Sequence, residues 1–140
     1  MLNKQFPVIT GLYQLTKEWF LTLPGKYNKR LEKGEMVIWN QGFTMWIAVY
    51  NNDKKLSPQK QIEWIKEEKS PESYGVKEID EGNIYRYGYK LEEIEEEKKV
   101  NSFNAFVSSK IGYVCIAFYY DRKDDYKKAE KIWKSISLQT

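Results

Sequence analysis

The amino-acid sequence predicts an α+β fold: an antiparallel β-sheet flanked by two amphipathic helices, that is, an α/β/α sandwich. Aromatic and β-branched runs at 36–39 and 43–50 surround the break at 40–42, and this pattern is typical of a β-hairpin. Both faces of this hairpin are nearly apolar, so each should need a covering layer. Two further segments, 58–69 and 126–136, carry apolar residues at helical spacing and would supply the cover.

The first elements are short strands. The run 19–23 reads as a strand that Pro24-Gly25 ends, and 27–31 reads as a second strand before a turn at Lys33-Gly34. The hairpin follows. Ser57 and Pro58 then open a helix in the expected order of N-cap and first-turn proline.

The second half of the sequence predicts an antiparallel β-meander. A short strand at 75–79 and a turn at 81–83 precede 84–91, where apolar and polar residues alternate strictly. This alternation continues through the glutamate run 92–97, and we expect a turn near Lys98-Lys99. Strands at 100–108 and 111–120 then complete three antiparallel neighbours.

The last helix has the clearest pattern. Asp124 or Asp125 is the expected N-cap, and a single apolar stripe follows. Its members are Tyr126, Ala129, Ile132, Trp133 and Ile136.

The length and composition of the chain predict a single domain over residues 1–140. The chain has 41% hydrophobic and 16% aromatic residues, enough to build a core without disulfides. Its net charge of +3 lacks the concentrated basic character of a nucleic-acid binder, and the basic stretch 26–33 reads as a solvated strand. The sole cysteine, Cys115, sits in an apolar run and is expected to be buried. The N-terminal residues lack a signal-peptide core and no window is long enough to cross a bilayer, so we expect a cytoplasmic protein without a membrane partner.

The sequence contains no histidine. The absence of histidine excludes catalytic sites of the Ser-His-Asp and Cys-His types. Because the chain also has only one cysteine, it excludes the usual zinc sites as well. No glycine-rich phosphate loop is present, and Asp121, Asp124 and Asp125 fit a helix start better than a cation site. We therefore predict no enzyme activity, no cofactor, no catalytic residue and no metal.

The residues chosen as candidate partner-binding positions are Glu93, Glu95, Glu97, Tyr87 and Tyr89. Alternation places the three glutamates on one strand face, where like charges repel and glutamate is a poor strand former. Residues that destabilise their own strand without a structural benefit are candidates for a binding surface. A solvated hairpin tip is the alternative for the glutamates, and core packing is the alternative for the tyrosines.

The chain resembles the PsbP-like superfamily of α/β/α sandwiches. The resemblance rests on W-F-L-T-L-P at 19–24 with the following hairpin, on the Ser57-Pro58 helix start, on the meander, and on the closing segment 113–136. It covers nearly the whole chain. Because members of that superfamily are mostly adaptors, accessory subunits or secretion-linked chaperones, the resemblance implies binding rather than catalysis.

The predicted function is that of a non-enzymatic protein-binding module, in its most concrete form a bacterial immunity protein that neutralises a cognate toxin. The first alternative is a secretion-system effector chaperone or accessory adaptor, which should show a large exposed apolar groove. The second is a small-ligand carrier or a carboxylate-based enzyme, which should show a concave pocket lined by acids of raised pKa. The expected partner is another protein, with the chain itself a monomer or weak homodimer.

Overall fold

The computed structural model describes residues 2–139 and consists mainly of one antiparallel sheet. The elements follow in chain order: β1 (Val8–Gln14), β2 (Trp19–Glu32), β3 (Glu35–Asn40), β4 (Phe43–Asn51), α1 (Pro58–Lys66), β5 (Tyr74–Asp80), β6 (Ile84–Glu95), β7 (Lys98–Ser109), β8 (Gly112–Tyr120), a 3-10 turn η1 (Lys123–Asp125), α2 (Tyr126–Ser135) and β9 (Ser137–Leu138).

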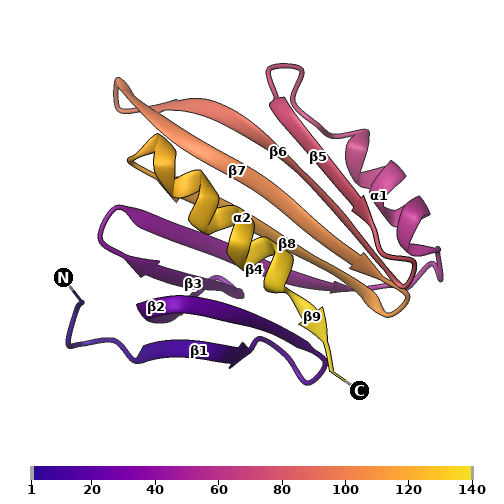
Figure 1. Ribbon diagram of the computed structural model, residues 1–140, viewed down its shortest axis with the longest axis horizontal. Helices are drawn as coiled ribbons and strands as arrows, with labels where there is room; N and C mark the ends of the chain where they lie inside the picture. The colour runs from indigo at the N-terminus through magenta and orange to yellow at the C-terminus, as the bar shows by residue number, and fades with distance from the viewer. Residues whose placement is uncertain (1, 140) are drawn as a thin grey trace.

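The sheet joins two meanders side by side. Its order is β1-β2-β3-β4-β8-β7-β6-β5, and β9 adds a short pairing to β2. The chain leaves β4, passes through α1 to the far edge at β5, and returns strand by strand until β8 lies beside β4 (Figure 1). The β4–β8 ladder, from Phe43↔Tyr120 to Asn51↔Gly112, therefore holds the two halves together.

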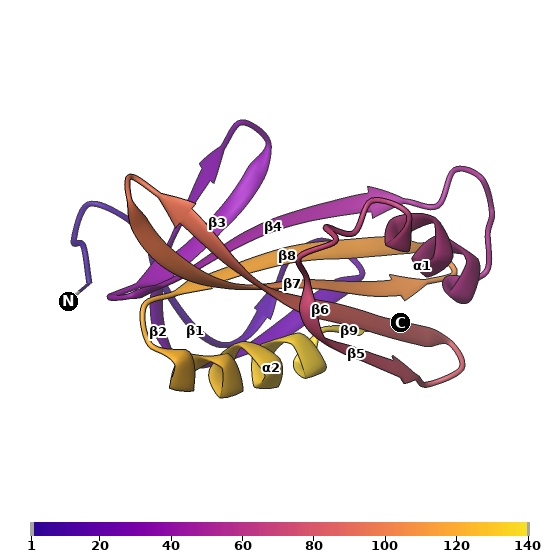
Figure 2. The same cartoon turned by 90° about the horizontal axis from the view of Figure 1, so that it is seen from above.

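The predicted α/β/α sandwich is wrong. Strands make up 57% of the chain and helices 16%, so the fold is a sheet-rich one. Figure 2 shows α2 lying along one side of the sheet, with α1 at one end of the other side. A nine-residue helix is about 13 Å long, whereas eight strands span about 34 Å, so α1 is too short to form a second layer.

The core lies between α2 and the sheet. Ala129, Ile132 and Trp133 of α2 are fully buried, as the predicted stripe requires. They belong to one hydrophobic cluster with an alternate set of strand residues, in sheet order Leu21 and Leu23 of β2, Met45 and Ile47 of β4, Val114, Ile116 and Phe118 of β8, and Phe103, Ala105 and Val107 of β7. A smaller cluster around Ile62, Tyr87 and Tyr89 lies beneath α1.

The N-terminal strands differ from the prediction. Pro24-Gly25 does not end a strand: β2 continues through both residues, and β1, which was not predicted, pairs with it. The β1–β2 register shifts between Ile9 and Gly11, opposite Pro24-Gly25. On the edge of β2 that faces away from β1, only residues 19–20 and 28–32 pair, with β9 and β3 respectively. Pro24 lies between these paired segments, so its missing N–H removes no hydrogen bond from that edge.

The central hairpin and the start of the first helix are confirmed, and Asp125 takes the N-cap position of α2 without a capping hydrogen bond from its side chain. Asn40 pairs with Phe43 across the predicted turn, and the Ser57 side chain accepts a hydrogen bond from the backbone N–H of Lys60 at 3.2 Å. The first helix ends at Lys66, three residues before the expected Lys69. In the meander the turn lies at Glu96-Glu97, two residues before the predicted one, because Glu95 pairs with Lys98.

Candidate functional site: the open face of the sheet

The central strands carry apolar residues on both of their faces, but only one face is covered. On β4 and β8 the residues facing α2 are buried except Val49, whereas the alternate residues are half-buried or, at Tyr50, exposed. We define the open face by these half-buried positions and their neighbours on β3 and β7: Val37, Trp39, Thr44, Trp46, Ala48, Tyr50, Asn104, Phe106, Tyr113, Cys115, Ala117 and Tyr119. A solvent-facing sheet normally alternates apolar with polar residues, and here half of the second set is aromatic.

Small side chains hollow the middle of the open face. Ala48, Cys115 and Ala117 lie next to one another across the β4–β8 ladder, and Trp46, Tyr50 and Phe106 rise around them. The result is a depression of about 130 Å³, which Glu35 and Asn104 also line. Burial raises the pKa of the Cys115 thiol to about 12, so the thiol is neutral and unreactive near pH 7.

One cation already lies on this face. The Arg30 guanidinium of β2 stands 4.7 Å from the ring centre of Trp39 and 5.7 Å from that of Trp46. Its Nη2 lies 2.9 Å from Oε2 of Glu32. Aromatic faces and a carboxylate together hold the guanidinium in place.

A larger hollow adjoins the depression where α1 meets the sheet. This end pocket has a volume of about 430 Å³ and shares Tyr50 with the depression. Tyr50 stacks on Tyr113 with ring centres 5.1 Å apart, and Trp64 of α1 meets Tyr113 edge-on at 6.4 Å. Lys54 lies 5.5 Å from the Trp64 ring centre.

Hydrogen bonds fix the walls of the end pocket. The Asn52 side chain donates to the carbonyl oxygens of Leu56 and Lys110 at 2.7 and 2.9 Å, which orders the 52–56 loop. From α1, the buried Gln61 amide donates to Ser108 Oγ at 3.0 Å and to the Ser109 carbonyl oxygen at 2.6 Å. The pocket is thus formed by fixed elements.

The predicted tyrosines lie beneath and beside α1. Tyr87 is only 1% exposed and stacks on Phe106, with ring centres 5.9 Å apart, while Lys66 lies 5.4 Å above the ring. Burial raises the pKa of Tyr87 to about 12, and its hydroxyl has no hydrogen-bond partner among the described residues. Tyr89 is also buried. Both side chains therefore pack in the small core under α1, and Tyr87 presents no surface to a partner.

The predicted glutamates do not all share one strand face. Glu93 and Glu95 alternate on β6 with Tyr87 and Tyr89, on the side of the open face, but Glu97 lies in the turn. Burial raises the pKa of Tyr119, and the negative charges of Glu93, Glu95 and Glu35 raise it further. One oxygen of Glu93, Oε2, is buried and lacks a hydrogen-bond donor among residues 2–139.

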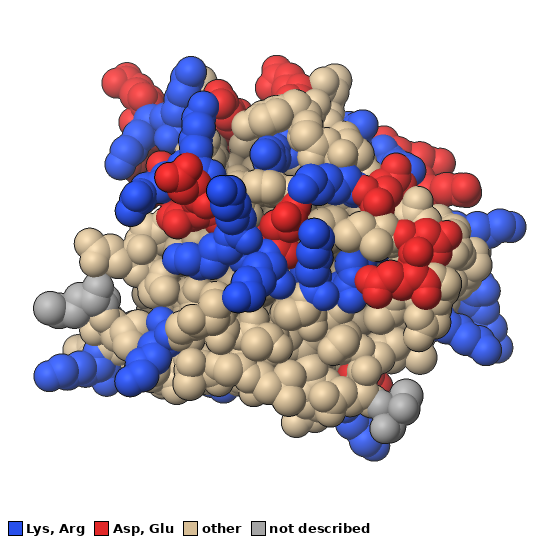
Figure 3. Space-filling view, in the orientation of Figure 1, with Lys and Arg blue, Asp and Glu red and all other residues tan. Residues whose placement is uncertain are grey.

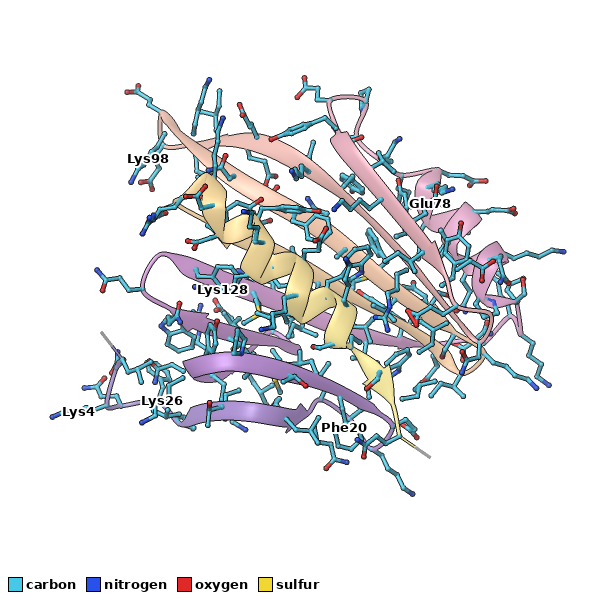
Figure 4. The ribbon with its side chains drawn as sticks, in the orientation of Figure 1. Lys4, Phe20, Lys26, Glu78, Lys98 and Lys128 are labelled. Atoms are coloured by element: carbon cyan, nitrogen blue, oxygen red, sulfur yellow. The ribbon has the colours of Figure 1, made fainter. Side chains whose placement is uncertain are left out.

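The opposite side of the molecule has a different character. Lys, Arg, Asp and Glu side chains intermingle over α2 and the neighbouring strands (Figure 3). In Figure 4, Lys128 lies on α2, whereas Glu78 projects from β5 near α1, where it pairs with Lys66 at 2.5 Å. Within the described residues, no three acidic or cysteine side chains gather in a way that could hold a metal ion.

Sequence reasoning missed the aromatic residues of the open face, above all Trp46, Tyr50 and Tyr119. The signal was present, because the 43–50 strand was seen to be apolar on both faces. The error lay in assuming that a second helix layer would cover it. The contact between Trp64 of α1 and Tyr113 of β8 joins distant parts of the chain, and no local pattern predicts it.

Comparisons with known proteins bear on the fold alone. No protein-family model matches the sequence, and no curated protein matches it. Among solved structures, the chain is similar to a protein from Bacteroides thetaiotaomicron, with a TM-score of 0.68 and 11% identity. The match covers 94% of this chain and 50% of that one, so this chain spans about half the length of its structural neighbour. The PsbP-like resemblance stays a prediction. No helix among residues 2–139 is long and apolar enough to span a membrane.

Proposed function

We propose that this chain is a non-enzymatic protein-binding module that holds its partner against the open face. The observation that carries the proposal is the missing cover over β4 and β8. Their α2-facing residues are buried, and the aromatic residues on the other side are left partly in water. A partner that covers this side would bury the aromatic rings, which supply large contact area at low entropic cost.

The dimensions of the open face suit a protein contact. The open face lies on four strands of six to twelve residues; with about eight residues per strand it covers about 19 by 27 Å, or about 500 Å². A typical interface buries about 800 Å² on each partner, so the contact would extend beyond the strands. The turn between β2 and β3 and the helix α1 both stand on this side of the sheet and provide such rims (Figure 2).

In its most concrete form the module is a cytoplasmic immunity protein that neutralises a toxin. Arg30, Glu35 and Asn104 interrupt the aromatic surface, and the depression holds only about 130 Å³. This mixture favours a polar and aromatic contact over the long apolar groove expected of an effector chaperone. A toxin gene beside the gene for this chain would support the immunity role, and a secretion cluster would favour the chaperone.

The end pocket favours one other candidate, a small-ligand carrier. Its volume of about 430 Å³ lies within the usual range for ligand sites, and Tyr50, Trp64 and Tyr113 give it aromatic walls. Asp53 lines this pocket, whereas the two carboxyl groups with a clearly shifted pKa lie outside it. Glu78 and Glu130 have lowered pKa values, which hydrogen bonds from lysine and tyrosine bring about against the effect of burial.

Site-specific photo-crosslinking tests the proposal. A benzophenone amino acid replaces Tyr50, which is 48% exposed beside the depression, and the purified chain is irradiated in extract of its source organism. We expect a discrete crosslinked protein that mass spectrometry identifies and that then binds the purified chain in calorimetry. The matched control carries the same amino acid at Lys131, on the exposed side of α2. Equal crosslinking from both positions, or none from Tyr50, contradicts the proposal.

A further inference from the structure

The end pocket continues the open face. Tyr50 lines both the pocket and the depression, and Tyr113 belongs to the open face as well as to the pocket wall. The helix α1, which carries Trp64, stands on the same side of the sheet (Figure 2). The strands of the open face offer about 500 Å², whereas a typical interface buries about 800 Å² on each partner. A partner that covers the open face therefore needs further contact area, and the end pocket offers it directly beside Tyr50.

The walls of the end pocket favour a planar ring as its occupant. Tyr113 holds the other two rings in place, because it stacks on Tyr50 and meets Trp64 edge-on. Tyr50 is 48% exposed and Trp64 is 47% exposed, so about half of each side chain stays open to an occupant. Stacked and edge-on neighbours are the ones that an aromatic ring prefers. The volume of about 430 Å³ lies at the low end of the range for ligand pockets, which suits one ring.

The buried polar group of the pocket leaves one acceptor free. Gln61 lines the pocket and is 2% exposed. Its Nε2 donates both hydrogens within the fold, to Ser108 and Ser109, but its carbonyl oxygen Oε1 forms no hydrogen bond with any described residue. This oxygen is not one of the side-chain atoms that lack both a partner and solvent contact, so it remains accessible from the pocket. An occupant should therefore bring a hydrogen-bond donor.

The second amide that lines the pocket has no free group. Asn52 Oδ1 accepts a hydrogen bond from the backbone N–H of Leu56 at 3.0 Å, and Nδ2 donates to two carbonyl oxygens. Neither amide side chain thus has an N–H left for an acceptor on the occupant. Asp53 and Lys54 also line the pocket, and their opposite charges cancel. These groups together favour a neutral ring that donates a hydrogen bond and does not need to accept one.

We infer that the partner inserts a tryptophan side chain into the end pocket, where its indole N–H donates to Gln61 Oε1. This inference rests on the proposed function and names the residue by which the partner is anchored. Indole is neutral, planar and a donor only. Phenylalanine has no donor, and the hydroxyl of tyrosine is an acceptor as well, for which neither amide has a free N–H. Tryptophan is also among the residues that most often dominate the binding energy of an interface when they fill a pocket.

Titration of the purified chain with Nα-acetyl-tryptophan amide tests the inference. Backbone amide chemical shifts are followed by NMR, and we expect saturable shifts centred on residues 49–56, 61–64 and 113. The acetylated amide of 3-benzothienylalanine is the matched probe, since sulfur replaces the indole N–H while the ring keeps its shape. It should bind about threefold to tenfold more weakly, as expected for the loss of one hydrogen bond. Equal affinity of the two probes overturns the choice of tryptophan, and equal affinity of acetyl-leucine amide, or shifts without saturation, overturns the aromatic anchor.

Two aromatic residues of equal exposure provide the matched variants. Trp64→Leu removes one aromatic wall and should weaken binding of the tryptophan probe by about threefold to tenfold. Tyr74 on β5 is 46% exposed and lies outside the pocket, so Tyr74→Leu should leave the affinity unchanged. The amide spectra of both variants show directly whether they are folded. Equal losses in the two variants reject the pocket as the binding site.

The proposed function and the anchor fail in different ways. If Tyr50 crosslinks a protein but the tryptophan probe does not bind, the protein-binding module stands and the anchor is wrong. A crosslinked protein that contains no tryptophan also overturns the anchor. If the probe binds in the pocket and no protein crosslinks from Tyr50, the pocket is a site for a free indole compound, and both the protein-binding function and the partner's tryptophan are wrong.

Discussion

The Arg86 guanidinium donates a hydrogen bond to the carbonyl oxygen of Trp133, 3.0 Å away, and so joins β6 to the last turn of α2. The last carbonyl groups of a helix lack intrahelical partners and carry partial negative charge, so a buried arginine suits this place. Trp133 in turn donates from Nε1 to the carbonyl oxygen of Phe106 on β7, at 3.1 Å. One residue pair therefore fixes α2 on two neighbouring strands.

Replacement of Arg86 should destabilise the fold strongly. Arg86 is 4% exposed and also pairs with Glu81 at 2.5 Å, so Arg86→Met leaves a buried carbonyl group without its charged donor. We expect a loss of about 2–3 kcal/mol in the free energy of unfolding, measured by urea denaturation. The exposed Arg122 offers a control, and Arg122→Met should change stability by less than about 0.5 kcal/mol. Similar losses from both variants would show that the Trp133 contact contributes little.

Gly88 has no room for a side chain. A Cβ atom at this position would lie 2.6 Å from Cζ of Phe103, whose ring meets Trp133 edge-on at 5.2 Å. Gly88→Ala should therefore cost about 1–3 kcal/mol through overpacking, measured as a lower urea midpoint. In Gly25→Ala the new Cβ atom meets nothing closer than Tyr27 at 4.0 Å, and this variant should stay near wild-type stability. A neutral Gly88→Ala would mean that the Phe103 ring moves aside freely.

The turn at Glu96-Glu97 is strained and can be improved. Both residues have positive φ, 49° and 67°, which disfavours side chains other than those of Asn and Gly. The double variant Glu96→Asn/Glu97→Gly should raise the free energy of unfolding by about 1–2 kcal/mol in the same measurement. Glu96→Gln/Glu97→Gln removes the charges but keeps the strain. If it stabilises as much as the first variant, charge repulsion and not backbone strain is the cause.

Acid should weaken the contact between α2 and β5. Burial alone would raise the pKa of Glu130, but hydrogen bonds from Lys77 and Tyr126 outweigh it and lower that pKa below its ordinary 4.5. A carboxylate with a depressed folded-state pKa stabilises the fold above its unfolded pKa, and this stabilisation is lost as pH falls through the folded value. We therefore expect the urea midpoint to fall below about pH 4.5.

Variants of Glu130 and Glu67 identify the source of the acid effect. In Glu130→Gln the urea midpoint should be lower than that of the wild type at pH 7. Between about pH 5 and about pH 3, the midpoint of this variant should also change less than that of the wild type. The exposed Glu67 of the α1 C-cap serves as control, and Glu67→Gln should retain the wild-type pH profile. An unchanged profile in Glu130→Gln would assign the acid sensitivity to other carboxylates, of which Glu78 is next in line.

Local sequence signals predicted the elements better than their arrangement. The 43–50 strand, the Ser57 cap and the α2 stripe were all correct because each depends on neighbours in the chain. The turn at 96–97 was misplaced because the run 92–99 contains no Gly, Asn or Pro to mark it. The strand 8–14 was missed because it is an edge strand, whose exposed Val8 and Leu12 do not produce a clean alternation with polar residues.

The candidate site could be only partly predicted. Alternation correctly placed Glu93 and Glu95 on the strand face of Tyr89, but the β6–β7–β8 ladder, which brings Tyr119 to the same face two strands away, follows from no local pattern. Glu35 comes from still farther along the chain. A doubly apolar strand indicates that two surfaces need cover, and it does not indicate whether the cover belongs to the same chain.

Strict alternation along β4 and β8 assigns stability and recognition to separate sets of residues. Met45, Ile47 and Ile116 are buried in the core beneath α2, whereas Trp46, Ala48 and Ala117 are half-buried on the open face, where we expect substitutions to cost less stability. A lineage or a protein engineer could therefore exchange the outward residues for new specificities on an unchanged frame, much as antibodies diversify their loops.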